Sequence, residues 1–208
     1  MRTQLHIDIE TYSSVDIKLS GAYKYCESID FEILLLAYAI NDGPIKIIDL
    51  AQGEEMPLEF KALLTDSRVE KHAHNANFER NSFRAIGIDV PIEEWYCSAV
   101  KAGYCGFPLS LAGVSEAMKL EEKGKLTTSA ALIRFFSCPV KPTAKNGNQN
   151  RNYPKDNIEK WEEYKRYCIN DVEAEREIGK RLHKYVIPEF ERLNYLLDQE
   201  INDRGILI

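Results

Sequence analysis

Aliphatic and polar residues alternate near the start of the chain. The stretch LHIDIET, residues 5–11, has a period of two, which is typical of a half-buried strand. Side chains two positions apart on a strand project from the same face, so Asp8 and Glu10 lie side by side opposite a fully aliphatic face. Two like charges held this close repel each other and destabilise the fold unless something neutralises them. The pattern therefore predicts a strand that needs a counter-charge.

The next segments predict an antiparallel meander. Residues 11–28 are polar and rich in turn formers. The run FEILLLAYAI, residues 31–40, is continuously apolar and of strand length, which indicates a strand buried on both faces. The hairpin signal NDG at 41–43 leads into PIKIIDL as the returning strand.

Later segments alternate between strand and helix patterns. We expect a helix at 57–65 that begins with a proline and places Leu58, Leu63 and Leu64 on one side, a short strand at 69–75, and a helix at 77–87 ended by Gly87. A strand should open the segment 94–104, and serine- or threonine-capped helices should follow at 110–120 and 128–136. The rest predicts an exposed loop at 137–155, a long helix from about 156 to 183, and a further helix after Pro188. Mixed strands followed by β-α-β units and then helices predict an α/β sandwich with a mixed sheet.

Composition narrows the class of protein. With 208 residues and 44% hydrophobic content, the chain buries a proper core and forms one domain, with the beginning of a second. A net charge of −6 argues against a protein that coats duplex DNA or an anionic membrane, but not against an enzyme that grips a few nucleotides through metal ions. The longest apolar run, at 33–40, is too short to span a bilayer, and the chain enters a strand without a signal peptide. Five cysteines without a CxxC pair favour free thiols in a reducing cytoplasm.

Two further motifs carry acidic residues. In YCIND, Tyr167 and Asp171 are four apart on the long helix and share one face. In HAHNANFER, a strand-to-helix turn places Asn75 and Glu79 near a helix N-terminus. Taken alone, the first is a surface pair, and the second is helix capping with an acid that suits the helix dipole.

Together, the three motifs resemble the DEDD exonuclease superfamily in its tyrosine-bearing subgroup, the DnaQ-like 3′–5′ exonucleases with an RNase H-like fold. The order and spacing fit over residues 5 to about 185. The stretches YCINDVEAEREI and LDQEINDRGILI are similar to the proofreading domain of phage-type family A DNA polymerases running into the polymerase part. The resemblance implies an exonuclease domain over 1–188 and the truncated start of a polymerase region over 189–208, in the cytoplasm of a bacterial or phage-infected host cell.

The resemblance also implies the metal chemistry. Oxygen-only ligands suit hard cations such as Mg²⁺ or Mn²⁺, which supply the missing counter-charge. Asp8 is expected to bridge two ions, Glu10 and Asp171 to complete the first, and Glu79 to support the second, partly through water. Two such ions activate a water and stabilise the leaving 3′-oxygen in an in-line displacement.

The remaining roles follow from the same resemblance. Tyr167 is expected to orient the attacking water, and Thr11 and Asn75 to contact the terminal nucleotide. The implied partners are the 3′ end of single-stranded DNA and a covalently attached polymerase domain, with no membrane partner. The chain departs from the family pattern at Glu79, where the usual residue is aspartate, and this puts the geometry and affinity of the second metal in doubt.

Two other functions stay open at this point. One is a 3′–5′ exoribonuclease of the same superfamily, although the closing LDQEINDRGI favours a polymerase. The other is a non-catalytic module that binds single-stranded 3′ ends. The presence of an acid at all four expected positions argues against this alternative.

Several polar residues outside the three motifs receive simple interpretations. His6 shares the acidic face of the first strand and is interpreted as a surface histidine, with contact to the substrate as the alternative. His72 and His74 alternate on a strand and lack cysteine or histidine partners at zinc spacing. Lys141, Lys145 and Arg151 either meet phosphates or belong to a solvated loop.

Overall fold

A mixed five-stranded sheet forms the centre of the molecule, in the order β3-β2-β1-β4-β5. The computed structural model describes residues 2–120 and 129–206 of the chain. The strands are β1 (Thr3–Tyr12), β2 (Glu32–Ile40), β3 (Lys46–Asp49), β4 (Val69–Ala73) and β5 (Trp95–Cys97). β1 and β2 pair antiparallel, as do β2 and β3, whereas β4 is parallel to β1 and to β5. This confirms the predicted fold class, an RNase H-like mixed sheet that joins an antiparallel meander to parallel strands.

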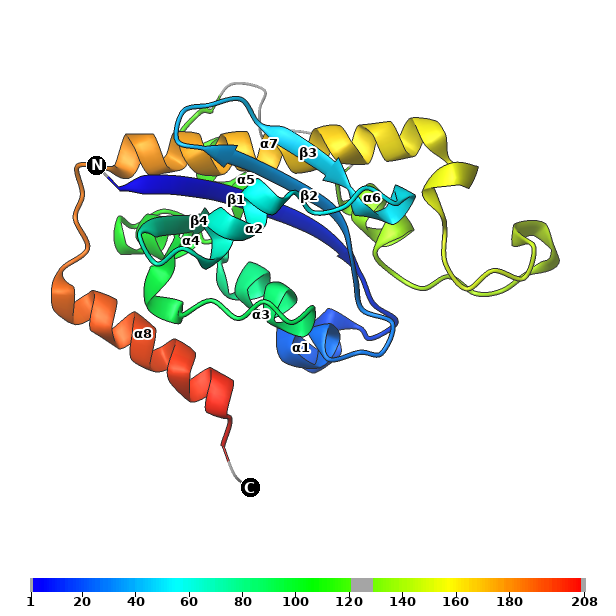
Figure 1. Cartoon of the computed structure of the whole chain (residues 1–208), viewed down its shortest axis with the longest axis horizontal. Coiled ribbons are helices and arrows are strands. Elements are labelled where there is room, and N and C mark those ends of the chain that lie inside the picture. Colours follow the sequence, from blue (N-terminus) through cyan, green and yellow to red (C-terminus); the bar gives the residue numbers. More distant parts are fainter. Residues whose placement is uncertain (1, 121–128, 207–208) are drawn as a thin grey trace.

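Helices cover both faces of this sheet (Figure 1). They are α1 (Ile17–Cys26), α2 (Leu58–Thr65), α3 (Asn77–Ala85), α4 (Ser98–Tyr104), α5 (Leu111–Ala117), α6 (Ser129–Phe136), α7 (Ile158–Leu182) and α8 (Glu189–Arg204). The predicted serine cap of α5 is confirmed, because the Ser110 side chain accepts a hydrogen bond from the amide of Gly113. The threonine expected to cap α6 lies outside the described residues.

The two faces of β1 meet different layers. The aliphatic face packs against α2 and α3 in one hydrophobic core, through Leu5, Ile7 and Ile9. The face that carries His6, Asp8 and Glu10 lies under α7. In Figure 1, α7 runs along the length of the sheet. The core on that side is formed mainly by β2, α6 and α7.

The polar face of β1 is therefore not solvated, contrary to the sequence-based expectation. His6 is only 5% exposed and Glu10 only 8% exposed. The interpretation of His6 as a surface histidine is wrong for the same reason. Local alternation identifies the strand, but the burial of its polar face depends on α7, which lies more than 150 residues later in the chain.

Two local predictions are also wrong. α1 occupies a segment predicted as turns; it is kinked at Gly21, whose φ of 78° and ψ of 169° are not helical. Its first turn is capped by the Asp16 carboxylate, which accepts a hydrogen bond from the Lys18 amide at 2.8 Å. In α2 the buried residues are Phe60 and Leu64, four apart, whereas Leu58 is 82% exposed.

The loop at 137–155 contains two short 3₁₀ turns, Ala144–Asn146 and Pro154–Asp156. Arg151 is fixed within it: one guanidinium nitrogen donates to Glu32 at 2.7 Å, and the group stacks 3.8 Å from the centre of the Tyr12 ring. Arg151 is thus neither a solvated residue nor a free phosphate ligand. Lys141 and Lys145 are exposed, as expected of a surface loop.

α8 is attached to the rest of the molecule by buried charge. Arg80, 2% exposed, donates to the Asp203 carboxylate at 2.6 Å, and Arg84 and Tyr23 donate to the same group at 2.9 and 2.7 Å. Arg192 donates to the Trp95 carbonyl at 2.8 Å. The helix also exposes an apolar stripe formed by Phe190, Leu193, Leu197 and Ile201. In the described part of the chain, none of the helices is both long and apolar enough to cross a bilayer.

Removing the Asp203 carboxylate should weaken this attachment. Asp203→Ala leaves the buried Arg80 guanidinium without its main partner, and breaking a buried pair in this way typically costs about 3–5 kcal/mol. We expect the free energy of unfolding in urea to fall by about 3 kcal/mol, at the low end because Asp203 is 21% exposed. Asp198→Ala, on the solvent side of the same helix, should change it by less than about 0.5 kcal/mol. Equal effects of the two substitutions would contradict this account of α8.

Candidate metal-binding active site

Asp8 and Glu10 lie next to each other on the covered face of β1. One oxygen from each carboxylate and the Cys168 sulfur on α7 all lie within 4.8 Å of one another. The Cys168 thiol donates to the Asp8 carbonyl at 3.7 Å, which fixes α7 against the strand. The two acids predicted from alternation alone therefore face the long helix directly.

α7 brings the third acid to the same place. Tyr167 and Asp171 share one face of the helix, and the Tyr167 hydroxyl is hydrogen-bonded to the Asp171 carboxylate. Tyr164, one turn earlier, donates its hydroxyl proton to Glu10 Oε2 at 2.5 Å. The packing side of α7 includes Val172, Ile178 and Leu182, which are buried.

Glu79 completes the group from the first turn of α3. Its side chain is 3% exposed, and its Oε2 atom is fully buried without a hydrogen-bond partner among the described residues. It is close enough to Asp8 and Glu10 for its charge to act on both carboxyl groups. The interpretation of Glu79 as a simple helix-dipole acid is incomplete, because a solvated carboxylate would serve that purpose without the cost of burial.

Burial and mutual repulsion make these groups hard to ionise. Burial, followed by the charges of Asp171, Glu10 and Glu79, holds the pKa of Asp8 well above its usual range. Burial also raises the pKa of Glu10, partly offset by the hydrogen bond from Tyr164. Burial raises the pKa of Glu79 to about 8, and it raises that of Asp171 to about 6 despite the opposing hydrogen bond from Tyr167.

The two predicted substrate contacts have different environments. Asn75 has a φ of 70° and an exposed side chain, and α3 begins after it without a side-chain cap. The capping alternative for Asn75 is therefore wrong. Thr11 is buried at a register shift in β1, and its hydroxyl lies 2.9 Å from the Tyr25 hydroxyl.

The donor set fits hard divalent cations. Asp8 Oδ2 and Glu79 Oε2 are buried polar atoms without a hydrogen-bond partner in the described structure. None of the ion pairs among the described residues involves Asp8, Glu10, Glu79 or Asp171. Clustered carboxylate oxygens without protein cations are ligands of the kind that Mg²⁺ and Mn²⁺ prefer.

Sequence motifs alone missed three residues of this face. Tyr164, Cys168 and Glu175 lie with Asp171 at intervals of three or four residues along α7, and all three are buried. Their signal was this helical spacing, which extends the Tyr167–Asp171 pair by one turn in each direction. A polar stripe of that length on a helix that also carries a core face indicates a buried site.

Comparisons with known proteins identify one relative of high similarity. No family model matches the chain. The chain is 51% identical over 205 residues to the DNA polymerase of Bacillus phage SP02, and this covers 98% of the chain but 32% of that polymerase. The chain thus spans about a third of the length of the curated relative that it matches.

Solved structures with a similar fold are more distant. The nuclease NrnC of Brucella melitensis has a TM-score of 0.48 at 12% identity, over 95% of this chain and 80% of NrnC. A structure of NrnC with bound Mg²⁺ gives 0.47 at 12% identity over the same shares of the two chains. A structure described as the apo form of a nuclease gives 0.44 at 14% identity, over 96% and 80%. Likeness at this level is too weak to assign a function.

Raised carboxyl pKa values predict how stability depends on pH without metal. A carboxyl group whose pKa is higher in the folded state stabilises the fold at low pH, and this contribution is lost as pH rises through its folded pKa. For Asp171 and Glu79 the loss should occur between about pH 4 and about pH 8. Asp8→Asn removes one of the repelling charges, so in EDTA its melting temperature should exceed that of the unsubstituted chain, by a margin that widens from pH 5 to pH 8.

Scanning calorimetry with and without Mn²⁺ checks this prediction. Mn²⁺ should raise the melting temperature of the unsubstituted chain at pH 8 and should have much less effect on Asp8→Asn. Asp89→Asn, an aspartate whose side chain is 73% exposed, serves as the control and should behave like the unsubstituted chain under both conditions. An Asp8→Asn chain that is strongly destabilised in EDTA would contradict the repulsion argument.

Proposed function

We propose that the chain is a 3′–5′ exonuclease domain that removes nucleotides from single-stranded or frayed DNA 3′ ends with the help of two divalent ions. The observation that carries the proposal is the unpartnered, buried oxygen on each of Asp8 and Glu79, within a group of four acids that has no protein counter-charge in the described structure. A fold that retains such a group at a cost in stability is suited to binding a cation, and carboxylates around Mg²⁺ or Mn²⁺ are typical of phosphodiester hydrolysis.

The four acids would hold the ions. Asp8, Glu10 and Asp171 would hold one ion, and Asp8 and Glu79 would hold the second. When bound, the ions supply an activated water and stabilise the leaving 3′-oxygen. Tyr164 keeps Glu10 in place through its hydroxyl and, being neutral, does not compete for the cation position.

Tyr167 and Asn75 would act on water and substrate. The Tyr167 hydroxyl orients the attacking water, and burial together with the acids around it raises its pKa, so that it stays a hydrogen-bond donor at every working pH. The exposed side chain of Asn75 contacts the terminal nucleotide. Thr11 shapes the same end of the site while its hydroxyl is engaged by Tyr25.

We further propose that the domain, residues 1–188, proofreads for an attached polymerase whose first segment is 189–208. The name of the phage relative and its greater length support this assignment. The apolar stripe on α8 supports it as well, because Phe190, Leu193, Leu197 and Ile201 form a continuous surface of the kind that a neighbouring domain covers. The relative's name also favours DNA over RNA as the substrate.

End-labelled oligonucleotides test the proposal. A 3′-labelled single strand should release its label at once, and a 5′-labelled strand should shorten stepwise, because attack begins at the 3′ end. Activity should disappear in EDTA, return with Mg²⁺ or Mn²⁺, and be absent in Asp8→Asn but retained in Asp89→Asn. Cleavage that continues after exhaustive chelation would refute the metal mechanism, and faster degradation of the matching RNA strand would favour an exoribonuclease.

Tyr167→Phe separates orientation of the water from metal binding. Phenylalanine preserves the ring but removes the hydroxyl, and a single positioned group of this kind is typically worth ~10²–10⁴ in rate. We expect kcat to fall by about that factor while Mn²⁺ affinity, measured by calorimetric titration, stays near that of the unsubstituted chain. Asp171→Asn should lower both kcat and Mn²⁺ affinity. Tyr104→Phe, at an exposed tyrosine, should change neither quantity. A Tyr167→Phe chain that cleaves at full speed would reduce the tyrosine to a packing role.

A further inference from the structure

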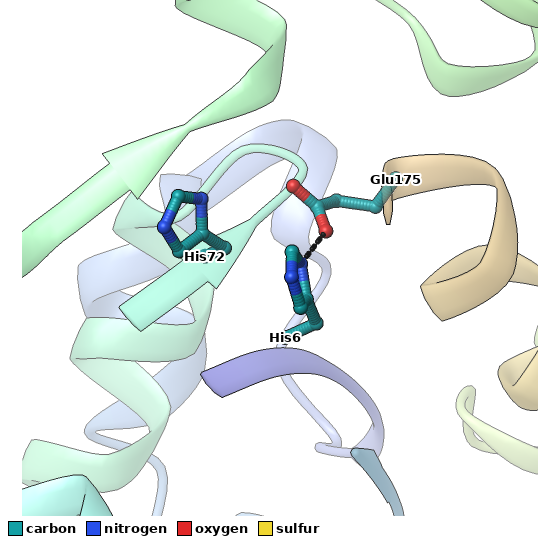
Figure 2. Close-up of side chains that lie close together, drawn as sticks. All are labelled: His6, His72 and Glu175. Atoms are coloured by element: carbon teal, nitrogen blue, oxygen red, sulfur yellow. Dashed lines mark hydrogen bonds and ion pairs between the residues drawn. The ribbon is translucent and has the colours of Figure 1, made fainter. Parts of the chain in front are cut away.

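Two histidines and a glutamate form a second cluster outside the acidic site. His6 on β1 and His72 on β4 are direct partners in the parallel register, so they stand side by side on one face of the sheet. Their ring centres are 5.0 Å apart. Figure 2 shows the carboxylate of Glu175 reaching from α7 toward both rings.

The ligand atoms of this cluster are close together. His6 Nδ1 lies 2.7 Å from Glu175 Oε2, and one ring nitrogen of each histidine and one Glu175 oxygen all lie within 4.8 Å of one another. Ligands held about 2.0–2.1 Å from a tetrahedral zinc ion are about 3.3 Å apart, so small adjustments, including a slight opening of the His6–Glu175 contact, would let all three bind one ion.

The three side chains of the cluster are largely buried. Glu175 is 2% exposed and His6 is 5% exposed, whereas the His72 side chain is 16% exposed. All three line a cavity of about 770 Å³ between the sheet, α7 and α8. His72 also stacks on Tyr96 of β5, with ring centres 5.1 Å apart, which limits its rotation. The cavity leaves space for a water or another small ligand beside the three side chains.

We propose that His6, His72 and Glu175 form a binding site for a borderline-soft divalent ion of the zinc class, separate from the carboxylate site for Mg²⁺ or Mn²⁺. Two imidazoles and one carboxylate with an open fourth position are a donor set typical of zinc, whereas carboxylates alone favour harder ions. On binding, the proton shared between His6 and Glu175 is displaced, because both atoms become ligands. The ion would join β1, β4 and α7 at a single point.

Sequence spacing does not reveal this cluster. The two residues that the fold brings beside His72 are 66 residues earlier and 103 residues later in the chain. His74, the neighbouring candidate, does not belong to the cluster, because its ring nitrogens contact the Ser98 hydroxyl at 2.9 Å and the Leu109 carbonyl at 2.8 Å. It is therefore a matched control.

Zinc titration of the 208-residue chain tests the proposal. The carboxylate site is first disabled by Asp8→Asn and Asp171→Asn, and ZnCl₂ is then titrated against a chromophoric zinc indicator. One tight equivalent should remain. Adding His72→Gln or Glu175→Gln should lower the zinc affinity of this site by more than the ~10–100-fold that follows loss of a residue that only hydrogen-bonds to a ligand. His74→Gln should leave the zinc affinity unchanged.

Co²⁺ replacing Zn²⁺ provides a second readout, since a four-coordinate site with nitrogen ligands gives visible absorption bands that His72→Gln should abolish. Each variant is checked for cooperative thermal unfolding without metal. Because His72 is less buried than Glu175, His72→Gln decides the test if Glu175→Gln does not fold.

The absence of a tight equivalent, or one that survives both His72→Gln and Glu175→Gln, would overturn the proposal. The readout is binding in a chain without two of its proposed catalytic acids. Its outcome is therefore independent of whether the chain is an exonuclease.

Discussion

The confinement of four carboxyl groups between β1, α3 and α7 is the constraint on which the rest of the structure depends. Glu10 and Glu79 are buried, Asp8 and Asp171 are partly covered, and each group lies near others of like charge, which opposes ionisation. For Glu79 alone, a pKa raised from 4.5 to about 8 corresponds to roughly 5 kcal/mol between its two protonation states. The fold tolerates this cost because β1 is the central strand of the sheet, with a hydrophobic core on either side.

The acids of the site have neutral tyrosine hydroxyls as hydrogen-bond partners, which explains why the site suits a cation. Glu10 accepts a hydrogen bond from Tyr164 and Asp171 from Tyr167, and both donors are neutral. A lysine or arginine in either place would neutralise the acids and occupy the space of a metal ion. Tyrosine instead orients the carboxylates and leaves their charge uncompensated, which is the condition for strong binding of a divalent ion.

Residues whose environment is set locally were predictable from the sequence. The period of two in β1, the apolar run of β2 and the hairpin signal before β3 fixed most of the sheet, and the spacing of Tyr167 and Asp171 placed them correctly on α7. Errors arose where a distant segment or a local break decided the outcome. The burial of His6 depends on Glu175 of α7, and α1 was missed because a helix interrupted at Gly21 has no continuous helical period.

The faces of β1 and α7 that carry the acids also carry His6 and Glu175. On β1, His6 precedes Asp8 by two residues, and on α7, Glu175 follows Asp171 by one turn, so each step moves along the shared face by about 6–7 Å. The charge of Glu175 is among those that raise the pKa of Glu79. Charge placed beside Glu175 is therefore felt by the acids through space, and any shift of α7 moves both groups together. The histidine cluster and the carboxylate cluster thus share one strand and one helix, and the charge of Glu175 acts on Glu79 of the acidic site.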